Sequence, residues 1–369
     1  MTPKAVPAIE ALASTTPFIA PEALARRAGL SSLLRLGANE SPLGPSPAAV
    51  EAMQGAVSGS WMYSEPESTD LRAALARYHG IAPENVSVGA GIDDLLALAV
   101  RAYLGDGTVA LGYGTYPTFL YHVAGYGGRA VTVPYENGRI PLDALAALAR
   151  EHQTPMVYLA NPDNPSGSYA SPAELARFME ALPDPTLLIL DEAYIDFADD
   201  FAPQVTIDPR VIRMRTFSKI YGMAGARIAY ALAAPEVVST FQKIRQHFGI
   251  NRLAQIGALA ALGDRAFFEQ VRRETARGRE AYRELGERLG CATIPSSTNF
   301  VCFDIGTRTR AEAMVEELLA RGVFIRKPGL PPLDRYVRVT VAAPQDHPRF
   351  AATFAQALAA IDAKEDVLV

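Results

Sequence analysis

The chain has 369 residues, of which 49% are hydrophobic, and a formal net charge of −5 at pH 7. Its basic residues are scattered, so charge gives no reason to expect a nucleic acid or an anionic membrane as partner. No run approaches the roughly 18 apolar residues that span a bilayer. Cys291 and Cys302 match no metal-ligand spacing, which favours small buried side chains and no metal site. We therefore predict a cytoplasmic protein with one large and one smaller domain.

Residues 1–47 are rich in Pro, Ser and Ala and are expected to form an arm that lies on the rest of the protein or on a second subunit. Over residues 48–250, short apolar runs alternate with helical patterns, which predicts an α/β domain whose mostly parallel sheet is flanked by helices. Ser171, Pro172 and Glu174 form a capping box that starts one helix. The strands predicted in this domain are 108–111, 130–133, 156–160, 186–190, 211–216 and 227–232.

The pattern changes over residues 251–369, where long charged helices are followed by short strands. This predicts a smaller α+β domain. No Gly/Ser-rich linker precedes it, so the two domains are expected to pack closely. The main helix is predicted over 267–289 and the strands over 299–303, 323–326 and 336–341.

Lys219 stands after a hydroxyl-rich turn, between two apolar strand-like runs, in the stretch 216–230. Apolar neighbours would desolvate its amine and favour the neutral form, which can act as a nucleophile or a base. Taken alone, Lys219 fits a surface lysine on a loop equally well.

Polar side chains follow three predicted strands at the points where they end. Asn164 lies in the loop 161–167, Asp191 and Tyr194 follow the strand 186–190, and Lys219 follows the strand 211–216. Each has an ordinary explanation as a turn, a helix cap or a packing residue. Because the carboxyl ends of parallel strands share one edge of a sheet, we expect the side chains to meet around one ligand.

That ligand needs an aldehyde for the lysine, a ring nitrogen for the aspartate and a ring hydroxyl for the asparagine and tyrosine. It also needs a phosphate, which small residues and the free N–H groups of a helix start would bind at Gly91, Ile92 and Asp93. Pyridoxal 5′-phosphate has all four groups. The sequence therefore predicts a pyridoxal-phosphate site.

The motifs at 39–44, 161–167, 191–194, 216–230 and 338–340, in this order, resemble those of the fold-type I pyridoxal-phosphate aminotransferases of class I/II. Within them, the chain looks most like the histidinol-phosphate aminotransferases. The resemblance implies that Lys219 forms the Schiff base and shuttles the proton, and that Asp191 pairs with the pyridinium nitrogen. It also implies that Asn164 and Tyr194 bind the ring 3′-oxygen, and that Ser218 and Arg227 hold the phosphate.

The resemblance implies further contacts. Phe119 would stack on the cofactor ring, and Tyr63 would reach the cofactor of the neighbouring subunit in a homodimer. Asn39, Arg326 and Arg338 would contact the substrate, the two arginines through its anionic group.

Two other positions bear on the substrate. Phe18 stands where the resemblance to the histidinol-phosphate aminotransferases implies a tyrosine that helps to bind the substrate phosphate. Arg252 fits a surface charge or an interdomain salt bridge, and it also fits a contact to a second acidic group of the substrate.

Several reactions stay open at this point. Histidinol phosphate as amino donor, with 2-oxoglutarate as acceptor, is the leading interpretation. An aminotransferase for an aromatic or dicarboxylic amino acid is the nearest alternative, because arginine binds carboxylate and phosphate alike. A related decarboxylase is a third possibility, and a regulatory cofactor-binding protein is a fourth.

Overall fold

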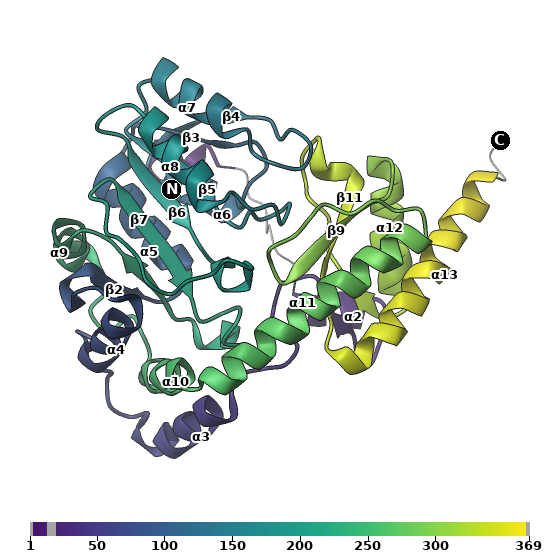
Figure 1. The fold of residues 1–369 in the computed structure, drawn as a ribbon, viewed down its shortest axis with the longest axis horizontal. Helices are drawn as coiled ribbons and strands as arrows, with labels where there is room; N and C mark the ends of the chain where they lie inside the picture. Colours follow the sequence, from purple (N-terminus) through teal and green to yellow (C-terminus); the bar gives the residue numbers. More distant parts are fainter. Residues whose placement is uncertain (1–2, 13–19, 367–369) are drawn as a thin grey trace.

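The computed structural model of the chain describes residues 3–12 and 20–366, so Phe18 lies outside the described residues. A seven-stranded sheet in the order β2-β8-β7-β6-β5-β3-β4 forms the centre of the larger part (Figure 1). Strand β8 is antiparallel to β2 and β7, and the remaining pairs are parallel. The strands are β2 (Val86–Gly89), β3 (Thr108–Gly112), β4 (Arg129–Val133), β5 (Met156–Ala160), β6 (Leu187–Asp191), β7 (Val211–Thr216) and β8 (Ala229–Leu232).

Helices cover both faces of this sheet, so β5 and the first four residues of β6 are apolar and buried. Ile189 of β6 packs on one side, while Leu188 and Leu190 pack on the other. On the Ile189 side lie α5 (Ile92–Ala99), α6 (Pro117–Gly125) and α9 (Pro235–Ile244), and on the other side lie α7 (Leu142–Glu151) and α8 (Pro172–Ala181).

The predicted α/β class with a mostly parallel sheet is confirmed. Every strand predicted in the larger part is present, with ends that shift by one or two residues. Strand β2 was not predicted, because its short apolar run leads directly into a glycine turn. The capping box of Ser171 and Glu174 is present at the start of α8.

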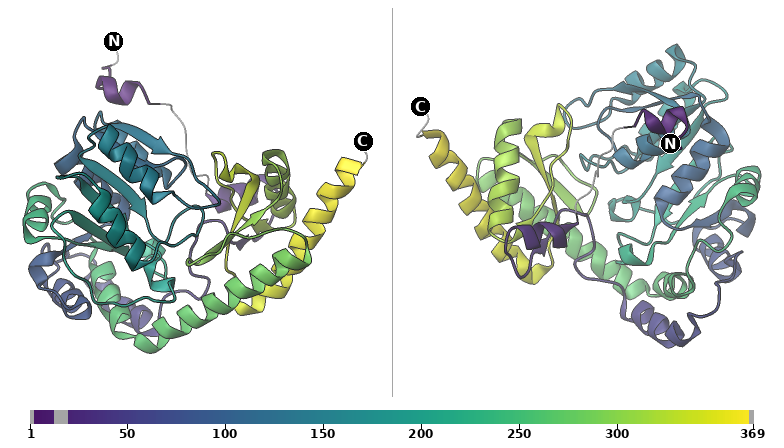
Figure 2. Two further views of the ribbon diagram at one scale, coloured as in Figure 1. Left: turned by 45° about the horizontal axis from the view of Figure 1, so that its top comes forward. Right: turned by 180° about the vertical axis from the view of Figure 1, so that it is seen from behind.

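The smaller part contains two two-stranded sheets. Strand β9 (Phe300–Asp304) pairs antiparallel with β11 (Tyr336–Thr340), and β1 (Leu34–Arg35) pairs parallel with β10 (Val323–Phe324). The N-terminal segment therefore contributes a strand to the smaller part. Helices α12 (Arg308–Ala320) and α13 (His347–Asp366) lie beside these strands, and α2 (Pro21–Arg27) lies close to them (Figure 2).

The long helix α11 (Arg265–Arg288) runs from the larger part to the smaller one (Figure 1). Helix α10 (Arg252–Gly263) packs with α3 (Pro47–Ala56) and α4 (Thr69–His79) in the core beside β2 and β8. This packing favours a domain limit after residue 263, while the division at 250/251 was predicted from the sequence. The other helices are α1 (Pro7–Glu10), η1 (Val57–Gly59), η2 (Pro83–Asn85), η3 (Val100–Leu104), η4 (Ile195–Phe197), η5 (Ala224–Ala226), η6 (Leu333–Arg335) and η7 (Pro344–Asp346).

Among the described residues, no helix combines the length and the apolar character that crossing a membrane requires.

Candidate active site

The carboxyl ends of β5, β6 and β7 meet at one edge of the sheet. Ala160 lies opposite Asp191 in the ladder, and Asp191 lies opposite Met214. Asn164, Asp191 and Lys219 all follow these strand ends or lie on them, so the structure brings the three predicted residues to the same edge.

Lys219 is half-buried, and its amine is held by main-chain carbonyls. Nζ donates to the carbonyl oxygens of Asn39 (3.1 Å) and Ala38 (3.4 Å), and it lies 5.4 Å from the ring centroid of Tyr194. Gly222 closes the turn by donating its N–H to the carbonyl of Lys219. A Cβ on Gly222, at φ +66°, would lie 2.0 Å from the carbonyl oxygen of Gly44. Only glycine therefore lets this turn pack on the N-terminal segment.

Asp191 is the last residue of β6 and is 5% exposed. Its Oδ2 accepts from the hydroxyl of Tyr158 (2.8 Å), and its Oδ1 accepts from the N–H of Ala193 (3.0 Å). Burial raises the pKa of Asp191 to about 6, although these two hydrogen bonds oppose the shift. A buried carboxylate of this kind is stabilised by a cationic partner.

Gly91 and the guanidinium of Arg227 lie next to each other at the start of α5. Gly91 has φ +99° and ψ 164°, a conformation that only glycine adopts easily. A Cβ at this position would lie 2.3 Å from Nη2 of Arg227. The missing side chain therefore makes room for the guanidinium beside a helix N-terminus, and the two together suit an anion.

Ile92 and Asp93 are the first residues of α5, as predicted for an anion site. Ser218 is 7% exposed, and its Oγ accepts from Oγ1 of Thr216 (2.9 Å), which leaves the hydroxyl hydrogen of Ser218 available. The carboxylate of Asp93 accepts a hydrogen bond from the hydroxyl of Tyr116 (3.1 Å).

The structure corrects the prediction for Phe119. This ring has no exposed surface and stacks on Tyr158, with ring centroids 4.4 Å apart, so it fills the core and lines no site. Tyr116 is partly exposed instead, and burial and the charge of Asp93 raise the pKa of its hydroxyl, with a smaller contribution from Asp191. Tyr116 lies four residues after the carboxyl end of β3, at the same edge of the sheet as the other site residues. This position in the sequence could have indicated Tyr116 as a site residue.

Asn164 and Tyr194 bond to other side chains at the edge. Oδ1 of Asn164 accepts from Nη1 of Arg338, and the hydroxyl of Tyr194 accepts from Nδ2 of Asn39 (3.0 Å). Asn39 is 2% exposed, and its Oδ1 accepts from Oγ1 of Thr340 (3.2 Å). The side chain of Asn39 is thus committed within the protein, which speaks against the predicted direct contact with a substrate.

Arg326 and Arg338 lie opposite each other, joined by a β-bridge. Nη2 of Arg338 donates to the carbonyl of Gly37 (3.2 Å), and its Nε is buried without a partner among the described residues. Burial and then the charge of Arg338 lower the pKa of Arg326. Two neighbouring guanidinium groups and an unused N–H form a site that an anion would stabilise.

Tyr63 and Arg252, unlike the residues at the strand ends, lie near the surface of the protein. Tyr63 is 78% exposed and packs on Phe248, with ring centroids 4.7 Å apart. The side chain of Arg252 lies close to Gly59, where an added Cβ would be 3.3 Å from Nε. Trp61, two residues before Tyr63, is 83% exposed, so this loop presents apolar surface to the outside.

A family model described as "Aminotransferase class I and II" matches residues 31–350. The chain belongs to this family. The aminotransferase is 33% identical to a histidinol-phosphate aminotransferase of Moorella thermoacetica over 95% of the chain and 92% of the relative. It is 36% identical to one of an Anaeromyxobacter species, over 95% and 98%.

Among solved structures, a histidinol-phosphate aminotransferase of Sinorhizobium meliloti in complex with pyridoxal-5′-phosphate has a TM-score of 0.92 and 42% identity. The match covers 98% of the aminotransferase and 99% of that chain. An aspartate aminotransferase of Thermus thermophilus aligns with a TM-score of 0.78 and 25% identity, over 96% and 100%. The predicted family and class of reaction are thereby confirmed.

Proposed function

We propose that this aminotransferase uses pyridoxal 5′-phosphate to transfer the amino group of histidinol phosphate to 2-oxoglutarate. The relatives named above carry the name of this activity, and the S. meliloti structure holds this cofactor. Since the family transfers amino groups, the decarboxylase and regulatory interpretations lose their support.

The residues at the strand ends fit the cofactor. The pair of Gly91 and Arg227, called the phosphate cradle below, suits the cofactor's phosphate. Because Gly91 has no Cβ, the guanidinium of Arg227 can lie beside the start of α5, where an anion binds. The buried carboxylate of Asp191 suits a protonated ring nitrogen, and Lys219 lies at the same edge. Ser218, Ile92 and Asp93 would hold the phosphate end, and Asn164 and Tyr194 would hold the ring hydroxyl. Tyr116, rather than Phe119, would supply the aromatic contact to the cofactor.

When bound, the cofactor supplies an aldehyde that condenses with amines and a ring that takes up the electron pair released at the substrate Cα. Lys219 accepts the Cα proton at Nζ, and the carbonyls of Ala38 and Asn39 hold that nitrogen in place. Asp191 would hold the ring nitrogen in its protonated form, and the hydroxyl of Tyr158 and the N–H of Ala193 orient its two oxygens. Each residue thus holds or moves a charge at a defined atom.

The Nε of Arg338 lies beside Arg326 and is buried with no partner in the described part of the chain, and this observation best supports an anionic substrate group. Arginine binds phosphate and carboxylate alike, so an aromatic or dicarboxylic amino acid is the second candidate donor.

The exposed surface of Tyr63, Trp61 and Phe248 supports a homodimer in which Tyr63 and Arg252 face the site of the neighbouring subunit. Such contiguous apolar surface is typical of protein interfaces. We place the homodimer in the cytoplasm.

The identity of the amino donor can be tested by following the absorbance of the cofactor-loaded enzyme after mixing with each candidate. Mixing with histidinol phosphate is expected to convert the spectrum to the pyridoxamine form faster than mixing with any of a panel of L-amino acids. Arg338→Lys keeps the charge and loses the planar fork, so this variant should raise the KM for histidinol phosphate about tenfold or more. Rapid conversion by amino acids alone would refute histidinol phosphate as donor and leave the aminotransferase activity intact.

A further inference from the structure

Asn299 immediately precedes β9 in the smaller part and is 3% exposed. Its Nδ2 donates to two main-chain carbonyl oxygens of the N-terminal segment, those of Asn39 (3.1 Å) and Glu40 (3.2 Å). If the amide were flipped, Oδ1 would face two carbonyl oxygens and no hydrogen would lie between them. The hydrogen bonds therefore fix the orientation of the amide. One amide from the smaller part therefore binds two successive peptide groups that lie 260 and 259 residues earlier in the chain.

One of these carbonyls also serves Lys219. The oxygen of Asn39 accepts both from Nδ2 of Asn299 and from Nζ of Lys219, each at 3.1 Å. A carbonyl oxygen has two lone pairs and can accept both bonds. The amide of Asn299 thus helps to position the carbonyl oxygen of Asn39, to which the amine of Lys219 is hydrogen-bonded.

The Asn39 backbone is not in a relaxed conformation, so it depends on such contacts. Its φ of +54° is uncommon for a residue other than glycine. Thr340 accepts from the N–H of Asn39 (3.0 Å), and Asn299 and Lys219 both bond to its carbonyl. A strained backbone persists only where its surroundings over-determine it. Without Asn299, the carbonyl loses one of the groups that fix it.

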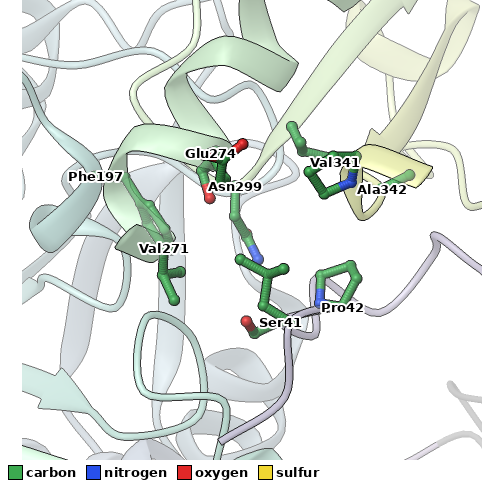
Figure 3. A pocket seen from close by; sticks show the side chains of 11 residues that line it. Ser41, Pro42, Phe197, Val271, Glu274, Asn299, Val341 and Ala342 are labelled. Atoms are coloured by element: carbon green, nitrogen blue, oxygen red, sulfur yellow. The ribbon is translucent and has the colours of Figure 1, made fainter. Parts of the chain in front are cut away.

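Oδ1 of Asn299 is buried without a partner among the described residues. The side chain lines a small cavity between the N-terminal segment, α11 and the end of β11 (Figure 3). An unsatisfied buried acceptor is unfavourable for stability. Asn299 therefore makes its two donated bonds through Nδ2 while its Oδ1 stays unsatisfied. A residue that only filled space would not need a polar group with this cost.

The geometry points to a role for Asn299 as a positioning residue that orients Lys219 for proton transfer at the substrate Cα. This role rests on the proposed function, in which Lys219 is the base. A neutral amine has two N–H donors and one lone pair. With the donors bonded to Ala38 and Asn39, the lone pair is the free direction, and it takes the proton as the Cα–H bond breaks. The electron pair of that bond goes to the cofactor ring.

The test compares Asn299→Leu with a matched control in the same turn. Thr298 has no exposed surface and bonds through its hydroxyl to Ser296 and Phe300, so Thr298→Val removes buried hydrogen bonds and leaves Asn39 untouched. Both variants are assayed as holoenzymes, per mole of lysine-bound cofactor measured by absorbance. The donor is whichever of histidinol phosphate and the L-amino acids the wild type converts fastest, used unlabelled and deuterated at Cα.

Asn299→Leu is expected to lower kcat at least tenfold, to change KM less than threefold, and to increase the deuterium isotope effect on kcat. Thr298→Val should keep kcat within twofold and leave the isotope effect unchanged. Equal losses in the two variants, or an unchanged isotope effect in Asn299→Leu, would overturn the positioning role. Should Asn299→Leu not fold, Asn299→Ala is measured in the same way and judged by the same outcomes.

Because the donor is chosen by the wild type, failure of histidinol phosphate as substrate leaves this comparison valid. A wild type that converts no donor would overturn the proposed function, and the role of Asn299 with it.

Discussion

Replacing Gly91 with alanine tests the phosphate cradle most directly. The new Cβ would lie 2.3 Å from Nη2 and 3.0 Å from Cζ of Arg227, far inside van der Waals contact. The guanidinium is the end of a flexible side chain, so it would move away and lose its bond from Nη1 to the carbonyl of Ala224 (3.1 Å). The substitution therefore displaces Arg227 without removing it.

The magnitude follows from two effects. Alanine at φ +99° and ψ 164° costs about 1–3 kcal/mol of backbone strain, which lowers stability and loosens the start of α5. A hydrogen bond to a charged group is worth about 1.5–3 kcal/mol. Losing one from Arg227 to the phosphate should weaken cofactor binding about 10- to 100-fold.

The assay is a titration of the cofactor-free protein with pyridoxal phosphate and, separately, with pyridoxal, which lacks the phosphate. Gly225→Ala is the matched control, because a Cβ there would meet no atom of residues 3–12 and 20–366 within 4 Å. Gly91→Ala should weaken binding of pyridoxal phosphate and leave pyridoxal nearly unaffected, while Gly225→Ala changes neither. An equal loss for both ligands, or no loss, would refute the assignment of the cradle to the phosphate.

Three further outcomes are expected. Lys219→Ala should abolish turnover while the protein still binds the cofactor non-covalently, and substantial transamination under saturating donor would contradict its role as base. Gly222→Ala should lower the free energy of unfolding by about 2–5 kcal/mol in urea titrations, because its Cβ would lie 2.0 Å from the carbonyl of Gly44, whereas Gly263→Ala should cost nothing. Burial raises the pKa of Asp196 to about 6 from 3.8, so its ionised form opposes folding at pH 7.5, and this cost fades as the pH falls through 6. Asp196→Asn should therefore be more stable than wild type at pH 7.5, by at most about 3 kcal/mol, and the gain should shrink at pH 5; a gain independent of pH would contradict the shift.

The architecture of the sheet and the set of polar residues at its edge could be predicted from the sequence. Apolar runs alternating with amphipathic helices leave few arrangements other than a covered parallel sheet, and parallel strands end at the same edge. The order of residues along the chain was therefore enough to bring Asn164, Asp191 and Lys219 together, because each stands directly at a strand end or in the loop after it.

Which side chains face this edge, and which groups hold them, depends on how distant segments pack together. Phe119 and Tyr116 lie three residues apart at the start of one helix, and the packing of Phe119 on Tyr158 makes it a core residue. The bonds from Asn299 to Asn39, and from Arg338 to Asn164, join positions 260 and 174 residues apart. No local pattern encodes such pairs, because they depend on how the smaller part, the N-terminal segment and the large sheet pack together.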